Sequence, residues 1–268
     1  NFVCLPVCYC RFGSSKPVVA HLVNESYVMC DSPPKTNEDH VMVQVSLNSV
    51  DFTSSQAVFN YYKSPLISSI FPFTGSEEGG TRVKVIGANF INSKYLVCKF
   101  GMHAAPTKAF FINERLLECV SPPYSPGSVS VSVSNNGHDF SHRTALFRFN
   151  NKLVLDGFQP NSGPTTGGTR VYIEGHRFYF NSLLSCKFDT DVVPASFVSS
   201  KKIYCTTPRH RVGFSKLYVG NNGADYVPAN RNFKFIEPPK VLNISPNFGP
   251  ELSMVKITVE GMNFAHGS

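Results

Sequence analysis

A short motif recurs three times along this chain at a constant interval. A cysteine, a basic residue and a phenylalanine stand together at Cys10, Cys98 and Cys186, and 98 minus 10 and 186 minus 98 both give 88 residues. This period is longer than the roughly 20 to 50 residues of a solenoid coil, and a segment of this size can enclose a core of its own. The sequence therefore predicts a string of similar modules.

Further features repeat with this motif. A second cysteine follows after 20, 21 or 19 residues, at Cys30, Cys119 and Cys205. The two intact module openings carry a glycine-rich turn, at Gly79-Gly80-Thr81 and at Gly167-Gly168-Thr169. A proline turn comes after each second cysteine, and an aspartate followed by an aromatic residue comes before the last strand. Since these features keep one order, a single module is the unit that the fold must explain.

Alternating apolar and polar residues dominate each copy. Short runs with a period of two, bounded by Gly, Pro, Asn and Ser, are typical of β-strands with one buried face, and helix signals are almost absent. In the run 129–134 the valines are expected to face a core, while Ser130, Ser132 and Ser134 face water. A second sheet must cover the apolar face. About seven short strands per module predict a β-sandwich.

Asparagine, glycine and aspartate mark the expected turns. Asn136-Gly137 and Asn222-Gly223 suit the positive φ of a tight hairpin, with an irregular loop as the alternative. An aspartate recurs at Asp51, Asp139 and Asp225, each before a strand aromatic. Hydrogen bonding within a turn explains these aspartates better than catalysis does. Calcium requires about six to eight oxygen ligands, and each aspartate stands alone.

The motifs resemble a known family when they are taken in order. Ile-x-x-x-x-Pro, Gly-Gly-Thr-x-Val, Gly-x-x-Phe, Cys-Lys-Phe-Gly, Cys-x-x-Pro and Val-x-Val-x-Val are similar to the IPT/TIG domain. This immunoglobulin-like module is shared by plexins, the hepatocyte growth factor receptor, fibrocystin-like proteins and some transcription factors. The resemblance implies an all-β chain of tandem immunoglobulin-like sandwiches of the E-set type. Ser253-Met254 stands where the fourth copy should have its paired glycines, so its turn departs from the pattern.

The repeat divides the chain into four modules. We expect the C-terminal part of a first IPT/TIG domain at 1–63, complete domains at 64–150 and 151–237, and the N-terminal part of a fourth at 238–268. Junctions of only a few residues predict that neighbouring modules are stacked semi-rigidly. The chain resembles a segment of a longer array.

The regular cysteine pairs predict one disulfide in each of the first three modules. The expected pairs are Cys10 with Cys30, Cys98 with Cys119, and Cys186 with Cys205. Closing a loop of about 20 residues contributes on the order of 3 kcal/mol in the chain-entropy model. Such bonds persist in oxidising surroundings, which predicts an extracellular or secretory-pathway location. Reduced, buried cysteines are the alternative, and the spacing does not suit zinc.

Other features bear on the same location. Cys4 and Cys8 have no partner in the repeat, and the pattern leaves open whether they bond to each other or to residues upstream. Asn24 and Asn243 begin N-glycosylation triplets, so a glycoprotein is expected. No run reaches the roughly 20 apolar residues of a membrane span, so we expect membrane contact only through regions outside this chain. The start of the chain is not a signal peptide.

The chain carries a formal net charge of +7, yet only 16% of its residues are charged. The densest basic cluster is a possible patch for anionic glycans, acidic protein surfaces or lipid headgroups. Solvated loop charge is the simpler account of it. Its members are Lys201, Lys202, Arg209, Arg211 and Lys216.

Several functions find little support in the residues. Histidines and acids are scattered, so we predict no enzyme, catalytic residue, cofactor or metal site. DNA binding in the manner of Rel-like immunoglobulin-like domains is disfavoured, because disulfides place the chain outside the nucleus. Carbohydrate-binding accessory modules remain an alternative that would use Tyr and Phe, since Trp is absent.

The remaining prediction is an extended, disulfide-stapled array at a cell surface. Its expected function is protein–protein recognition, adhesion or structural spacing, as in a receptor ectodomain. Its expected partners are other proteins, including further copies of itself, and possible anionic glycans, without nucleic acid. A structural component of an extracellular filament or surface coat is the leading alternative.

Overall fold

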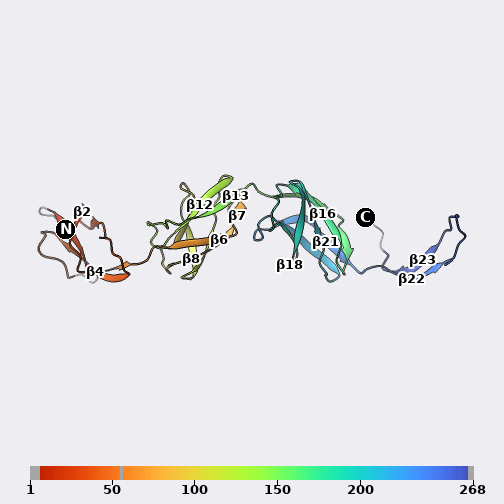
Figure 1. The fold of residues 1–268 in the computed structure, drawn as a ribbon, viewed down its shortest axis with the longest axis horizontal. Coiled ribbons are helices and arrows are strands. Elements are labelled where there is room, and N and C mark those ends of the chain that lie inside the picture. Colours follow the sequence, from red (N-terminus) through yellow and green to blue (C-terminus); the bar gives the residue numbers. More distant parts are fainter. Residues whose placement is uncertain (1–6, 55–56, 265–268) are drawn as a thin grey trace.

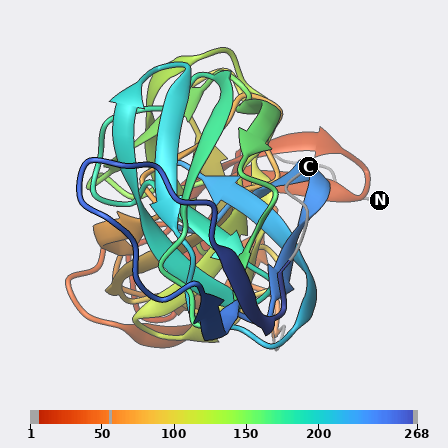
Figure 2. The ribbon, with the colours of Figure 1, turned by 90° about the vertical axis from the view of Figure 1, so that its right-hand side faces the viewer.

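Every regular element of the described chain is a β-strand. The structure is a computed structural model that describes residues 7–54 and 57–264. Within these ranges the 23 strands form separate sheets that follow one another along the chain, so the array is elongated (Figure 1). Seen along the long axis, the modules lie behind one another (Figure 2). The predicted all-β fold of tandem immunoglobulin-like sandwiches is confirmed.

The second module contains eight strands. They are β6 (Leu66–Phe71), β7 (Thr74–Ser76), β8 (Arg82–Ala88), β9 (Val97–Phe100), β10 (Thr107–Asn113), β11 (Leu116–Val120), β12 (Gly127–Ser134) and β13 (Ala145–Asn150). Their order is β6-β8-β11-β10-β9-β12-β13-β7. Strand β10 begins beside β9 and continues beside β11, so it links the two layers of the sandwich.

The third module repeats this arrangement. Its strands are β14 (Val154–Gln159), β15 (Ser162–Pro164), β16 (Arg170–His176), β17 (Ser185–Phe188), β18 (Asp191–Ser199), β19 (Lys202–Thr206), β20 (Gly213–Gly220) and β21 (Val227–Ile236). The order β14-β16-β19-β18-β17-β20-β21-β15 matches that of the second module strand for strand. The sequence period therefore corresponds to a repeat of topology.

The flanking segments supply parts of the same plan. The first module has β1 (Cys8–Phe12), β2 (Val18–Asn24), β3 (Tyr27–Cys30), β4 (Asp39–Ser46) and β5 (Val58–Tyr61), in the order β3-β2-β1-β4-β5. At the other end, β22 (Lys240–Ser245) pairs antiparallel with β23 (Thr258–Met262). This hairpin corresponds to the pairing of β6 with β8 and of β14 with β16.

Phenylalanine fills the two complete cores. In the second module Phe100, Phe147 and Phe149 are fully buried, and their ring centroids lie 4.9 to 6.2 Å apart. Edge-to-face contacts at such distances suit the quadrupoles of aromatic rings. Phe188, Phe233 and Phe235 form the equivalent cluster in the third module. Each sandwich therefore has its own core, which explains why the modules fold as separate sheets.

Two expectations about the surface were wrong. Ser134 is buried rather than facing water, because its hydroxyl donates to Oδ1 of Asn136 at 3.0 Å in the loop that follows β12. Asn136-Gly137 and Asn222-Gly223 do not form tight hairpins either. The loops that join the paired strands are longer, 135–144 and 221–226, although both glycines adopt positive φ. The irregular-loop alternative is the correct one.

The glycine-rich turn gives a testable contrast between two neighbours. Gly79 and Gly80 have φ of +75° and +82°, but only at Gly79 would a Cβ atom clash, lying 2.5 Å from the carbonyl carbon of Pro122. We expect Gly80→Ala to lower the free energy of unfolding by about 1 kcal/mol, for the left-handed conformation alone. Gly79→Ala should lower it by clearly more, since backbone must move. Urea denaturation measures both losses, and equal losses would contradict the prediction.

Candidate functional site

The second and third modules meet through the loop 221–226. Asn222 donates from Nδ2 to the carbonyl oxygen of Thr74 at 2.8 Å, and Thr81 donates from Oγ1 to Oδ2 of Asp225 at 2.6 Å. Thr81 is 1% exposed and Asn222 4%. Because these partners lie 144 and 148 residues apart in sequence, the bonds hold two separate sandwiches against each other. We call this contact the joint.

An Asn-x-x-Asp sequence builds the loop at the joint. Oδ1 of Asn222 accepts the backbone N–H groups of Ala224 and Asp225 at 3.1 and 2.8 Å, while its Nδ2 donates to Asp225 at 2.8 Å. The loops at Asn136 to Asp139 and Asn48 to Asp51 make the same bonds. This supports the interpretation of the three aspartates as turn residues. Sequence reasoning took Asn136 and Asn222 for hairpin residues and missed that an asparagine three residues before each aspartate, Asn48 included, holds the turn.

The glycine-rich turn of the second module positions the Thr81 hydroxyl, which donates to Asp225. The N–H of Gly80 donates to the carbonyl oxygen of Ser121, and the N–H of Thr81 donates to the Ser121 hydroxyl at 3.2 Å. A Cβ at Gly75 would lie 2.2 Å from Oγ1 of Thr81, so only glycine leaves room for it. The Thr81 hydroxyl is therefore held in one position.

Carboxylates also hold the linker between these modules. One oxygen of the Glu77 carboxylate accepts the backbone N–H of Lys152 at 3.1 Å, and the other accepts Nδ2 of Asn151 at 3.2 Å. The Lys152 ammonium lies 3.0 Å from Glu78, and Arg177 donates to the Lys152 carbonyl oxygen. The joint thus combines loop contacts with linker contacts and restrains the angle between the sandwiches.

A groove of about 440 Å³ lies at the same boundary. Phe73, Leu146 and Arg148 line it from the second module, and Tyr179 and Phe180 line it from the third. Phe73, Leu146 and Phe180 are 52%, 71% and 84% exposed. In the part of the chain that the structure describes, Arg148 makes no ion pair and no acidic residue lines the groove. The groove is thus apolar with one uncompensated cation.

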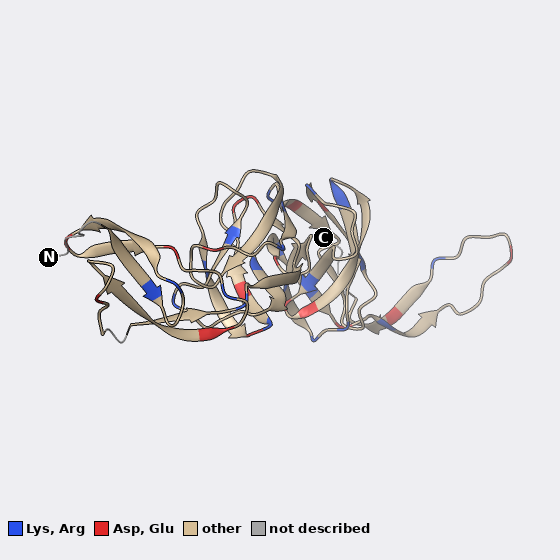
Figure 3. Ribbon diagram, turned by 60° about the vertical axis from the view of Figure 1, so that its left-hand side comes forward, with Lys and Arg blue, Asp and Glu red and all other residues tan. Residues whose placement is uncertain are grey.

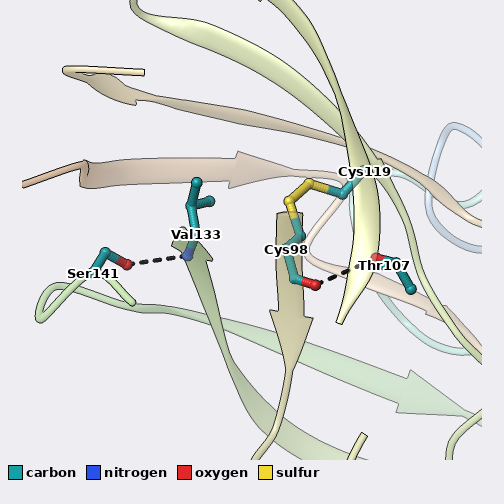
Figure 4. The surroundings of a disulfide bond; sticks show 5 residues. All are labelled: Cys98, Thr107, Cys119, Val133 and Ser141. Atoms are coloured by element: carbon teal, nitrogen blue, oxygen red, sulfur yellow. Dashed lines mark hydrogen bonds between the residues drawn. A yellow bond between two sulfur atoms is a disulfide. The ribbon is translucent and has the colours of Figure 1, made fainter. Parts of the chain in front are cut away.

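The structure joins the predicted cysteine pairs. Cys98 on β9 bonds to Cys119 on β11, across the two layers of the second module (Figure 4). The pairs Cys10 with Cys30 and Cys186 with Cys205 take the equivalent places, and all three have a Cα–Cα distance of 6.3 Å. Cys8 is buried on β1, and Cys4 lies outside the described residues.

The predicted basic cluster is brought together only in part. Lys201 and Lys202 lie at the turn between β18 and β19, and Lys202 pairs with Glu174 at 3.1 Å. Arg209 and Arg211 follow the opposite end of β19 and line a different hollow. Lys216 lies on β20. Figure 3 shows lysine and arginine spread along the array rather than gathered in one patch.

The two candidate glycosylation asparagines are exposed. Oδ1 of Asn24 accepts the N–H groups of Ser26 and Tyr27 at the turn between β2 and β3. No hydrogen bond engages its Nδ2 within the described residues, so the atom that carries a glycan points to solvent. Asn243 lies on β22, where its Oδ1 accepts the N–H of Ile244. Asn24 therefore offers the better-presented acceptor.

In the described chain, the side chains of Asp39, Asp189 and Tyr62 have shifted pKa values, and those of Asp189 and Tyr62 bear on contacts between elements. Burial opposes ionisation of Asp189, but the N–H of Lys216 and the neighbouring His210 outweigh it and hold the pKa of Asp189 below its ordinary value. Burial raises the pKa of Tyr62, and the charge of Asp139 raises it further. This second effect is consistent with the loop that carries Asp139 lying near Tyr62, in the linker that precedes the second module.

The Tyr62 phenol provides a pH test of that proximity. Asp139→Asn keeps the turn oxygen but removes the charge, so the pKa of Tyr62 should fall toward its ordinary value without reaching it, because burial remains. With its pKa raised in the folded state, Tyr62 makes stability fall as pH rises from the unfolded-state pKa through the folded one. NMR titration of the Tyr62 ring measures the shift. An unchanged pKa, or one equally changed by Asp51→Asn, would contradict the assignment.

Residues 7–54 and 57–264 contain no group of three or more His, Cys, Asp or Glu side chains placed to hold a metal ion. Nor does any helix among them have the length and hydropathy needed to cross a bilayer.

Comparison with known proteins identifies relatives of the two complete modules. A family profile described as IPT/TIG domain matches residues 65–149 and 153–235. Fibrocystin-L of Mus musculus is 25% identical over 248 residues, which cover 91% of this chain and 6% of that protein. Plexin-A4 of Mus musculus is 27% identical over 206 residues, covering 74% of this chain and 11% of that protein. The chain spans about a tenth or less of the length of these curated relatives.

Two solved structures align with the chain at low TM-scores. The full extracellular region of plexin A4 covers 90% of this chain and 26% of its own, at 19% identity and a TM-score of 0.44. The surface glycan-binding protein PbSGBP-B of Prevotella bryantii covers 64% of this chain and 42% of its own, at 17% identity and a TM-score of 0.29.

Proposed function

Because the chain belongs to the IPT/TIG family of immunoglobulin-like domains, we propose that it is a non-enzymatic extracellular segment that recognises other proteins through the groove between its two complete modules. The groove carries this proposal, since it exposes Phe73, Leu146 and Phe180 around Arg148. Aromatic residues and arginine are enriched where protein interfaces gain most of their energy. A partner with an apolar side chain beside a carboxylate would match this surface.

The lining of the groove favours a protein over a sugar. Asn181 donates to the carbonyl oxygen of Tyr179 and accepts the N–H of Leu183. Asn221 accepts the N–H of Tyr179 and donates to the carbonyl oxygen of Arg177. Both amides thus use one donor and one acceptor within the third module, which leaves each amide one N–H and one lone pair for a ligand. The exposed apolar side chains and the Arg148 charge make up the larger part of what the groove offers, and this favours a protein partner.

Cysteine chemistry supports the extracellular part of the proposal. Three disulfides, one in each of the first three modules, persist in oxidising compartments and are rare in the cytosol. Asn24 presents a free amide nitrogen in a sequon at an exposed turn. These observations agree with a secreted or cell-surface chain. They favour neither DNA nor a nuclear partner.

A screen with a matched control tests the proposal. The chain, made multivalent, is presented to an array of extracellular proteins beside an array of anionic glycans. We expect protein ligands whose signal is lost with Phe180→Ser or Leu146→Asp and kept with Phe214→Ser, since Phe214 is 69% exposed but lies outside the groove. Protein ligands insensitive to both groove variants, or glycan ligands alone, would contradict it.

The filament alternative predicts a different measurement. A structural component of a coat would associate with itself through this surface, so the chain would sediment as a concentration-dependent oligomer. We expect a monomer in sedimentation velocity, because two copies meeting at their grooves would bring two Arg148 charges together with no acidic residue in the lining that the structure describes. An oligomer abolished by Leu146→Asp would favour the filament.

A further inference from the structure

We infer that the glycine-rich turn of the third module is a docking site for the Asn-x-x-Asp loop of a module that follows it. The carboxylate of that loop would accept a hydrogen bond from Thr169, as Asp225 does from Thr81 at the joint. The inference rests on the proposal that β22 and β23 open a fourth module, and it is independent of the groove. Its ligand class is an aspartate held in an asparagine-capped turn.

Both glycine-rich turns hold the threonine in the same way. Gly167 and Gly168 have φ of +76° and +86°, close to the +75° and +82° of Gly79 and Gly80. The N–H of Gly168 donates to the carbonyl oxygen of Thr207 at 3.0 Å, and the N–H of Thr169 donates to the Thr207 hydroxyl at 3.0 Å. These bonds repeat those that Ser121 makes in the second module.

The surroundings of the hydroxyl repeat as well. A Cβ at Gly163 would lie 2.3 Å from Oγ1 of Thr169, against 2.2 Å for Gly75 and Thr81. Ser162, which begins β15 as Thr74 begins β7, supplies a carbonyl group at the position that receives Asn222 in the joint. The third module therefore offers both acceptor and donor groups of the docking surface.

The two threonines differ in what covers them. Thr81 is 1% exposed under the loop of the third module, whereas Thr169 is only half-buried. Within the described ranges, the Thr169 hydroxyl makes no side-chain hydrogen bond comparable to that between Thr81 and Asp225. The same built surface is thus covered in one module and open in the next.

The linker after the third module has the same length as the linker before it, and the strand pairing that follows is equivalent, so a following module would begin at an equivalent position. Three residues, 151–153, separate β13 from β14, and three residues, 237–239, separate β21 from β22. A Cβ at Gly175 would lie 2.3 Å from the carbonyl oxygen of Val154, and one at Gly261 2.1 Å from that of Lys240. The first strands of the next module therefore pair as those of the third module do.

The linker contacts of the second module do not recur in the third, so the contact of the glycine-rich turn with an Asn-x-x-Asp loop can be tested by itself. Thr165 and Thr166 stand where the second module has Glu77 and Glu78, and the linker reads Glu237-Pro238-Pro239 instead of Asn151-Lys152-Leu153. The two carboxylates that hold the first linker therefore have no counterpart at these positions, and Pro238 and Pro239 have no N–H group to donate. The Thr169 turn is the part of the joint that the repeat preserves.

A grafted chain tests the inference with groups that this protein already has. Residues 240–268 are replaced by a second copy of 154–237, which places an Asn222 to Asp225 loop after the same three-residue linker. Hydrogen exchange is then followed at the backbone amides of Gly168 and Thr169. We expect at least tenfold slower exchange in the graft than in the unmodified chain, since the added hydrogen bond to a charged group must break before these amides can open.

Variants identify the bond responsible. Asp225→Ala in the added copy should restore fast exchange, Thr169→Val should do the same, and Thr169→Ser should retain the protection. The pair Thr81 and the original Asp225 serves as the positive control in the same molecule. Unchanged exchange in the graft, while the control pair still protects Gly80 and Thr81, would overturn the inference. Groove binding is unaffected by these changes, so the two proposals fail separately.

Discussion

Removing the Asp225 carboxylate should uncouple the second and third modules. In Asp225→Ala, Thr81 keeps its buried position but loses its acceptor, and Asn222 loses the oxygen that orients its amide. We expect the free energy of unfolding to fall by about 2 kcal/mol, since a buried hydrogen bond to a charged group is lost. Urea denaturation measures the loss. Spin labels on the two modules should report a broader distance distribution.

The second module supplies the control. Asp139→Ala removes the equivalent carboxylate from the equivalent Asn-x-x-Asp turn. Asp139 is exposed, and in the described chain its carboxylate accepts no hydrogen bond from a threonine hydroxyl. Its loss measures the turn alone. A fall no larger in Asp225→Ala than in Asp139→Ala, with an unchanged distance distribution, would show that the loop does not hold the joint.

Replacing both cysteines of the second module should give the largest loss of stability. Cys98 and Cys119 are fully buried and join the two layers of the sandwich across 21 residues of sequence. We expect Cys98→Ala with Cys119→Ala to lower the free energy of unfolding of that module by about 3 kcal/mol, because the unfolded chain regains the freedom that the bond removes. Calorimetry should show this module melting before the third.

The third module is the internal reference for that experiment, because its own disulfide is intact in the variant. In a strong reductant, which also breaks the disulfide of the third module, the difference between the melting temperatures of the two modules should disappear. If the double variant melted as the unmodified chain does, the covalent link would contribute little, and the argument from disulfides to an oxidising location would weaken.

The joint and the groove are connected in their consequences. Phe73 and Phe180 come from different modules, so the shape of the groove depends on the angle that the joint holds. A preformed site loses less conformational entropy on binding than one that must first be ordered. Asp225→Ala should therefore weaken any partner that bridges the two modules, although Asp225 lies outside the lining of the groove.

Local patterns predicted much of this architecture. The strand β12 could be located from its alternating valines, because Val131 and Val133 meet a core whatever the neighbouring module does. The cysteine pairs could be matched because equivalent strands face each other in any sandwich. Ser134 could not be placed from the alternation alone, since a loop from its own module folds back over it.

The basic cluster was only partly right as a prediction of proximity, for a related reason. Lys202 and Arg209 are close in sequence, but an extended strand advances about 3.3 Å per residue, so β19 carries them to opposite ends of the sandwich. Asn222 shows the converse case. Its contact with Thr74 spans 148 residues, and no local pattern indicates it.

The amino-acid sequence by itself determined the repeat, the all-β sandwich and the pairing of cysteines, because these follow from periodicity and spacing within one module. Only the tertiary structure decided which repeated aspartate reaches a neighbouring module, how the charges are distributed and where a groove opens. Those features depend on how two finished sandwiches are set against each other. Their contacts join residues of different modules, and the sequence pattern within one module does not indicate which residues of a neighbouring module lie close to it.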